Sequence, residues 1–270
     1  MSLLQSILMG IIQGATEFLP VSSSGHLALF KIIFNVNTET GLLFDTMLHL
    51  GTLVAVCIVY WKDVCNLIVA AFQLLFDIIA NFKTWISNKK NGEYTAYRRL
   101  INSAYKKFVV LILITTIPTG IMGVAFSSLI ERASQTLLVP GICLVITAIL
   151  LLISDTRPSG HKKVKKTTYA NAAVIGVAQG FATFPGLSRS GTTITTCLML
   201  GFDRAYAVKY SFLISLPAIL GANILELRHF DAAAVAGGSI AYYFIGMIVA
   251  GVVGYRSEER RVGKECCLPC

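Results

Sequence analysis

The sequence predicts an all-α, polytopic membrane protein. Apolar residues make up 55% of the 270 residues, charged residues only 14%, and the mean hydropathy is +0.69. Soluble domains are about 45–50% apolar and about 25% charged, so this composition excludes an ordinary soluble globule, and it also excludes disorder. A net charge of +9 is typical of membrane proteins whose cytoplasmic loops are basic. We therefore expect the bilayer as a partner and no nucleic acid.

Several segments are long and apolar enough to cross a hydrocarbon core of about 30 Å. The predicted spans are 45–61, 108–127, 136–154, 208–225 and 235–255. Residues 64–82 are apolar too, but Gln73, Asp77 and Asn81 recur there at four-residue spacing. This spacing places the three side chains on one helix face, which predicts a helix lying in the membrane interface.

The loops between these segments predict the orientation. Loop 83–107 contains seven Lys or Arg residues and one acid, and loop 155–169 contains five and one. Loops 35–44 and 128–135 have no excess of basic residues. The positive-inside rule therefore places the first two loops in the cytoplasm and the other two outside. An RNA-binding surface would also be basic, but a solvated cytoplasmic face explains both loops without a partner.

An internal repeat divides the chain into two halves. Residues 10–25 align with residues 176–191 at a constant offset of 166, with seven identities in sixteen positions. Three predicted spans separate the two segments, and an odd number places the halves in opposite orientations. We therefore predict an inverted-topology repeat, with halves 1–154 and 170–255.

Each half begins with an interrupted helix. Pro20 and a Ser-Ser-Ser-Gly run break the apolar segment 3–34, and Pro185-Gly186 breaks segment 170–203. Both are predicted to be re-entrant helical hairpins, because such backbone is tolerated at membrane depth only when it is buried in protein or lines a wet cavity. Broken helices at matching positions in two halves indicate the functional site.

The end of the chain does not follow this symmetry. The first half has three spans after its hairpin and the second has two, which predicts one further span that the chain lacks. Residues 256–266 read RSEERRVGKEC, which resembles the translation of a common sequencing-library adapter. We interpret 256–270 as non-native sequence and exclude it from the fold prediction. Coding DNA that does not spell the adapter would refute this interpretation.

The polar residues of the two broken helices form the candidate site. Glu17 lies in an apolar segment, where an ionisable group is costly and is a functional candidate, and Gln13 lies one turn earlier. The first loop continues with Ser22, Ser23, Ser24, Gly25 and His26. The second loop offers Ser188, Arg189, Ser190, Gly191 and Thr192. Hydroxyls, an arginine and two helix N-termini suit a phosphate group, and the carboxylate and imidazole supply acid–base or metal-binding capacity.

Each of these residues also has a structural interpretation. A serine in a membrane helix often only hydrogen-bonds to the backbone, His26 could cap a helix, and Glu17 could pair with Arg189 for stability alone. The combination favours function because both halves place polar residues at equivalent positions. Asp45 and His49, at the outer end of a predicted span, are weaker candidates.

The two motifs carry a family resemblance. The run from Gln13 to His26, QGATEFLPVSSSGH, and the run from Pro185 to Thr192, PGLSRSGT, resemble the two motifs of the undecaprenyl-diphosphate phosphatases of the BacA type. The resemblance covers residues 1–255. It implies an integral enzyme of the bacterial inner membrane that hydrolyses undecaprenyl diphosphate to undecaprenyl phosphate and inorganic phosphate. This reaction recycles the lipid carrier for cell-wall polymers, and excess enzyme confers bacitracin resistance.

The resemblance also implies roles for individual residues. It gives Glu17, Ser23, His26 and Arg189 as the catalytic set. Substrate contacts would come from Gln13, Ser22, Ser24, Gly25, Ser188, Ser190, Gly191 and Thr192. No organic cofactor is expected; Mg²⁺ or Ca²⁺ at Glu17 and a homodimer are compatible with the family. In our assignment Arg189 clamps the diphosphate, Glu17 is a base or holds a cation, and the attacking group, Ser23, His26 or water, stays open.

Three other functions share some of these sequence features. A lipid-phosphate flippase would use the same inverted repeats and helix ends without chemistry, but the Ser, His and Glu cluster favours an enzyme. A second lipid phosphatase class contains a Pro-Ser-Gly-His motif like residues 158–161, but its third motif needs a His where this chain has Thr195. A purely structural protein would not bury polar groups at such a cost.

Overall fold

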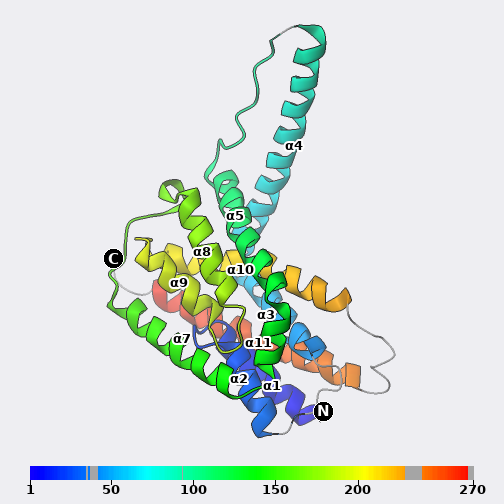
Figure 1. Cartoon of the computed structure of the whole chain (residues 1–270), viewed down its shortest axis with the longest axis vertical. Helices are drawn as coiled ribbons and strands as arrows, with labels where there is room; N and C mark the ends of the chain where they lie inside the picture. The colour runs from blue at the N-terminus through cyan, green and yellow to red at the C-terminus, as the bar shows by residue number, and fades with distance from the viewer. Residues whose placement is uncertain (35, 37–41, 93, 229–238, 267–270) are drawn as a thin grey trace.

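The computed structural model describes residues 1–34, 36, 42–92, 94–228 and 239–266, and Figure 1 shows their arrangement. Within these residues the structure is helical, with eleven α-helices and one 3-10 turn. The α-helices are α1 (Leu3–Glu17), α2 (Ser23–Ile33), α3 (Leu42–Val59), α4 (Trp61–Asn91), α5 (Ala104–Ala125), α6 (Ser127–Ser134), α7 (Leu138–Thr156), α8 (Tyr169–Phe181), α9 (Arg189–Met199), α10 (Arg204–Arg228) and α11 (Ser239–Cys266), and the 3-10 turn is η1 (Val164–Lys166). The predicted all-α class is confirmed.

Among the described residues, five helices are long and apolar enough to cross a membrane. They are Trp61–Lys90, Ala104–Ala125, Leu138–Thr156, Arg204–Leu225 and Ile240–Glu258. Four of them, in α5, α7, α10 and α11, correspond to predicted spans. The fifth prediction, 45–61, lies in α3, whose apolar part is shorter. The chain is therefore a multi-pass membrane protein.

Helix α4 is longer than expected. The sequence predicted an interfacial helix over 64–82, whereas α4 has 31 residues. No Gly or Pro interrupts it, and it ends only at Gly92, which adopts the left-handed conformation that commonly closes a helix. Its length and hydropathy make it a candidate span, so its place at the interface stays a prediction. Likewise α11 continues through the adapter-like residues, whose origin stays a prediction.

The two helical hairpins, α1–α2 and α8–α9, share their local construction. Ser2 and Gln5 form a capping box on α1, and Thr168 and Asn171, 166 positions later, form the same box on α8. Helices α2 and α9 both contain eleven residues and also begin 166 positions apart. The repeat seen in the sequence is therefore present in the helix boundaries and caps.

Each hairpin packs against a long helix from the other half of the chain. Helix α1 lies on α11, where a Cβ added to Gly10 would lie 2.6 Å from the Gly246 carbonyl oxygen, and helix α8 lies on α5. In the second pair a Cβ on Gly176 would meet the carbonyl of Thr115. Glycine at these positions allows the helices to approach closely. The halves are therefore interlocked around the two hairpins.

Gly10→Ala should destabilise the fold by about 1–3 kcal/mol, because the new methyl group would overlap the backbone of α11. Gly120→Ala is the matched control, since a Cβ there meets no described atom within 4 Å and alanine is a better helix former than glycine. Thermal unfolding in detergent measures both variants. Equal midpoints for the two would contradict the close α1–α11 contact.

Candidate active site

The loops of the two hairpins meet. A Cβ on Gly25 would lie 2.9 Å from the Cα of Gly186, and one on Gly191 would lie 3.0 Å from the carbonyl oxygen of Pro20. The backbone N–H of Gly186 also donates to Ser24 Oγ at 3.4 Å. Segments about 160 residues apart in sequence thus form one site, as the repeat predicted.

Serine caps hold the start of both second helices. Ser22 Oγ accepts from the N–H of Gly25 at 3.3 Å, and Ser188 Oγ accepts from the N–H of Gly191 at 3.0 Å. Ser22 has φ of +70°, which is uncommon for a residue other than glycine and costs about 1–3 kcal/mol. Backbone strain of this kind is typical of ligand-binding loops. The other N–H groups of the first turns have no partner within their own helix and are available to a ligand.

Helix α7 supports the second loop. Thr147 Oγ1 donates to the carbonyl oxygen of Gly186 at 3.0 Å and accepts from the N–H of Ser188 at 2.9 Å. Gly186 has φ of +92°, which a side chain would strain, and a Cβ there would meet the carbonyl of Pro140. The loop is therefore fixed from both sides before any ligand binds.

Glu17 is the centre of the site. Its Oε2 accepts from Ser23 Oγ at 2.6 Å and from Gln13 Nε2 at 3.0 Å, and its Oε1 forms an ion pair with Arg189. The Glu17 side chain is only 6% exposed. The structure thus brings together three of the four residues that the family resemblance gives as catalytic, from both halves of the chain.

His26 lies on the first turn of α2, and its ring bonds to the backbone of Ser22, the residue that caps this helix. Its Nδ1 lies 2.7 Å from the carbonyl oxygen of Ser22. Because a carbonyl can only accept, we assign the proton to Nδ1, which leaves Nε2 for a ligand or a proton. The residue is partly exposed.

His49 on α3 belongs to the site more closely than the sequence indicated. Its Nε2 lies 4.0 Å from Glu17 Oε2, an ion pair when the ring is protonated, and its Nδ1 lies 2.8 Å from the carbonyl oxygen of Asp45. Thr52, on the same helix, lies 3.4 Å from Gln13 Nε2. The sequence signal for this arrangement is the three-residue spacing of His49 and Thr52, which places both side chains on one face of the helix. Asp45 itself pairs with Lys31 at 2.5 Å and is not part of this network.

Two residues that were predicted to contact the substrate each have a buried oxygen atom. Neither atom forms a hydrogen bond with a described residue. These atoms are Thr192 Oγ1 and Gln13 Oε1. Thr192 lies one turn after Arg189, at the position that His26 occupies in the first repeat. A buried polar atom without a partner is costly, so both atoms are suited to bind a ligand.

The described residues do not fit a preformed metal centre. They include no group of three or more His, Cys, Asp and Glu side chains in ligand range. Glu17, the carboxylate expected to bind a cation, already accepts from Ser23, Gln13 and Arg189. A cage for Mg²⁺ or Ca²⁺ needs several oxygen ligands, which this arrangement does not supply.

The geometry defines a class of protein: a polytopic membrane protein with a buried carboxylate that contacts a hydroxyl and an arginine between two helix N-termini. Such a site is suited to bind phosphate groups and to activate a hydroxyl. The sequence profile of the family described as "Bacitracin resistance protein BacA" matches residues 6–259. The chain belongs to this family.

Similar proteins carry the name "Undecaprenyl-diphosphatase". The one from Methanosphaera stadtmanae is 39% identical over 95% of this chain and 87% of its own length. The one from Halothermothrix orenii is 37% identical over 94% of this chain and 86% of its own length. The one from Carboxydothermus hydrogenoformans is 37% identical over 94% of this chain and 85% of its own length. The similarity thus extends over nearly all of the chain, including both hairpins.

His49→Gln should lower kcat by about tenfold or more with a smaller change in KM, because Glu17 loses a neighbour that can share its charge or proton. Asp45→Asn is the matched control on the same helix, since only the backbone of Asp45 contacts His49. Steady-state kinetics of both variants provide the measurement. A kcat that falls equally in both would show that His49 contributes only to the stability of α3.

Proposed function

We propose that this chain hydrolyses undecaprenyl diphosphate to undecaprenyl phosphate and inorganic phosphate. The observation that carries the proposal is the buried contact of Glu17 with Ser23 and Arg189, because it joins a base, a nucleophile and a phosphate-binding cation. The names of the similar proteins support the same substrate. The reaction returns the lipid carrier to the synthesis of cell-wall polymers, and abundant enzyme would protect against bacitracin.

The diphosphate would bind between the two hairpins. Arg189 leaves part of its contact with Glu17 to hold the phosphate oxygens, and the N–H groups at the start of α2 and α9 contribute further donors. We expect further substrate contacts from the polar and glycine residues of the two loops and from α1: Ser22, Ser24, Gly25, Ser188, Ser190, Gly191, Thr192 and Gln13. The polyprenyl chain would extend into the bilayer along the apolar outer surface of the helices.

Ser23 is our choice of nucleophile. Its Oγ donates to Glu17 at 2.6 Å, which is the contact of a hydroxyl with its base. Ser23 Oγ attacks the terminal phosphorus, Glu17 takes the proton, and undecaprenyl phosphate leaves as a stable anion that needs no proton. Water then attacks the phosphoserine with Nε2 of His26 as the base, and the protonated Glu17 returns its proton to Ser23 Oγ as inorganic phosphate leaves.

A divalent cation would enter with the substrate. The diphosphate can supply oxygen ligands that the protein lacks, and Mg²⁺ or Ca²⁺ would then offset its charge. No step above depends on it. Calorimetric titration of the substrate-free protein with Mg²⁺ tests the idea, because saturable binding would require a protein cage.

We also propose that the two halves are inverted repeats with re-entrant hairpins, in the cytoplasmic membrane of the cell. The common offset of 166 in caps and helix starts supports the repeat, and the basic loops support the orientation. Cysteine accessibility at Ser2 and Thr168, the two equivalent hairpin starts, tests the topology. Labelling of both from one side of the membrane would refute it.

Glu17→Ala and Arg189→Ala should each lower phosphate release by about 10²-fold or more, because the first removes the base and the second removes charge stabilisation in the transition state. Arg132→Ala, an exposed arginine on α6, is the matched control and should keep normal turnover. Phosphate release from undecaprenyl diphosphate in detergent is the assay. It also separates the enzyme from a lipid-phosphate flippase, which would release none.

Rapid quench of a single turnover should trap acid-stable phosphoserine at Ser23. An acid-labile phosphohistidine at His26 would identify the other candidate nucleophile. If neither forms while phosphate is released, water attacks directly and Ser23 only orients it. Mass spectrometry of the peptide that contains both residues distinguishes the three outcomes.

A further inference from the structure

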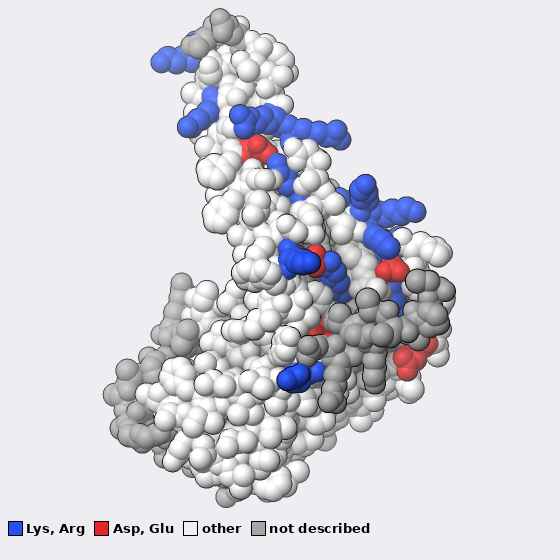
Figure 2. Space-filling view, turned by 180° about the vertical axis from the view of Figure 1, so that it is seen from behind, with Lys and Arg blue, Asp and Glu red and all other residues white. Residues whose placement is uncertain are grey.

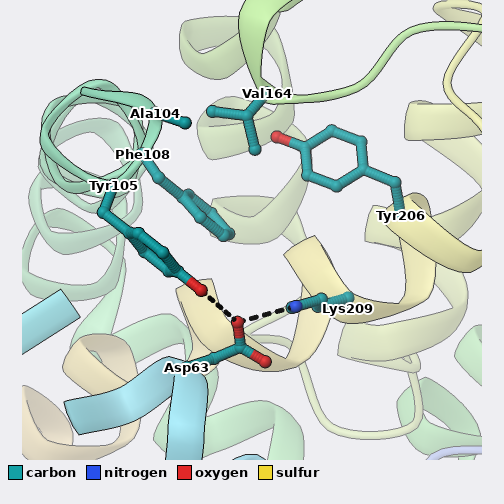
Figure 3. A pocket seen from close by; sticks show the side chains of 7 residues that line it. All are labelled: Asp63, Ala104, Tyr105, Phe108, Val164, Tyr206 and Lys209. Atoms are coloured by element: carbon teal, nitrogen blue, oxygen red, sulfur yellow. Dashed lines mark hydrogen bonds and ion pairs between the residues drawn. The ribbon is translucent and has the colours of Figure 1, made fainter. Parts of the chain in front are cut away.

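Helix α4 and the strap that follows it, residues 94–103, form an arm. In Figure 1 the arm projects away from the hairpins. Its root is fixed to the rest of the protein at a pocket of about 240 Å³, where Asp63 bonds with Lys209 at 2.7 Å and accepts from Tyr105 at 3.2 Å (Figure 3). Leu67, Ala70 and Leu74, on the first half of α4, are buried in a cluster with residues of α5. These contacts fix the direction in which α4 leaves the rest of the protein.

Two residues of the polar stripe, Asp77 and Asn81, contact the strap and the start of α5, whereas Gln73 is exposed. Asp77 bonds with Lys106 at 2.5 Å, and Asn81 both donates to and accepts from the backbone of Arg98, at 2.8 and 2.7 Å. Asn88 forms the same pair of bonds with Thr95, both at 3.0 Å. Seven residues of helix and three residues of extended chain each span about 10 Å. The distance along α4 from Asn81 to Asn88 therefore matches the distance along the strap from Arg98 to Thr95.

The opposite face of α4 is apolar and has no protein partner among the described residues. Its large side chains are each at least 43% exposed: Trp61, Ile68, Phe72, Leu75, Phe76, Ile79, Phe82 and Ile86. Lys83 lies on the same helix face, four residues after Ile79 and three before Ile86, so the apolar surface extends without a charge from Trp61 to Phe82 and needs a cover there. Since Asp77 and Asn81 already have partners on the other side of the helix, the cover contacts the apolar face.

The far end of the arm is cationic. Lys83, Lys89, Lys90, Arg98 and Arg99 are all exposed. Figure 2 shows Lys and Arg side chains along the arm and the adjoining part of the protein, above a broad, mostly uncharged surface. An apolar face beside clustered lysines is the chemistry of a helix that binds the surface of an anionic bilayer.

We propose that the arm lies along the cytoplasmic leaflet, with its apolar face among acyl chains and its distal cations at anionic lipid headgroups. Two observations argue against the alternatives. Two cationic arms would repel each other, which disfavours a second copy of the chain. The strap is extended and the asparagines satisfy only two of its residues, so its other backbone groups need water and the arm does not cross the membrane.

The two tryptophans of the chain, Trp61 and Trp85, both lie on α4. Replacing both by Phe gives a background without tryptophan emission. Ile86→Trp then reports on the distal apolar face, and Ala96→Trp, in the exposed strap, is the matched control for the water side. Both single-tryptophan proteins are reconstituted in nanodiscs that contain phosphatidylglycerol, with brominated lipid as a membrane quencher and iodide as an aqueous quencher.

The proposal predicts that brominated lipid quenches the Ile86→Trp protein and that iodide quenches the Ala96→Trp protein. Iodide quenching of the first would place the arm in water. Lipid quenching of both would place the arm across the membrane. Protection of the first from both quenchers, only in discs with two copies, would identify a second copy as the cover. Each of these three results overturns the proposal.

The charge is tested by the triple variant Lys83→Gln, Lys89→Gln and Lys90→Gln in the Ile86→Trp background. The parent should show stronger lipid quenching in phosphatidylglycerol discs than in phosphatidylcholine discs, and the triple variant should lose this difference. An unchanged difference would refute the role of the lysines. Phosphate release should stay at the parent level, which confirms that the variant is folded.

Discussion

The structure depends on the pairing of one buried carboxylate. An ionised group inside an apolar protein is strongly unfavourable unless charge and hydrogen bonds compensate it. Glu17 receives both, from Arg189 of the second hairpin and from Ser23 and Gln13 of the first. Because these partners come from opposite halves of the chain, the hairpins must meet for the charge to be tolerated. Assembly of the fold and assembly of the site are therefore the same event.

The packing around the hairpins explains how a site between two loops can be preorganised. Glycines 10 and 176 allow α1 and α8 to lie against long helices from the other half. Thr147 fixes the second loop, and the serine caps fix the first turns of α2 and α9. Donors held in this way need little reorganisation when a diphosphate develops charge, which is how such sites stabilise a transition state.

The candidate site and the arm both turn polar side chains toward protein partners. At the candidate site, polar side chains face inward because their ion-pair and hydrogen-bond partners are there. On α4, Asn81 and Asn88 face the strap, and large apolar side chains face outward. A membrane protein can expose apolar surface because its solvent includes lipid, so the direction of polar groups indicates where water and ligands are.

The sequence by itself determined the all-α class, most of the candidate spans, the 166-residue offset between the hairpins and the polar residues that meet at their loops. These follow from local properties, since hydropathy sets the spans, and a serine cap depends on residues three positions apart. Only the tertiary structure decided that His49 lies beside Glu17, that Asp45 pairs with Lys31 instead, and that the polar stripe of α4 binds a strap. Those outcomes depend on which helices become neighbours, and a pattern along one helix shows a polar face but not what that face contacts.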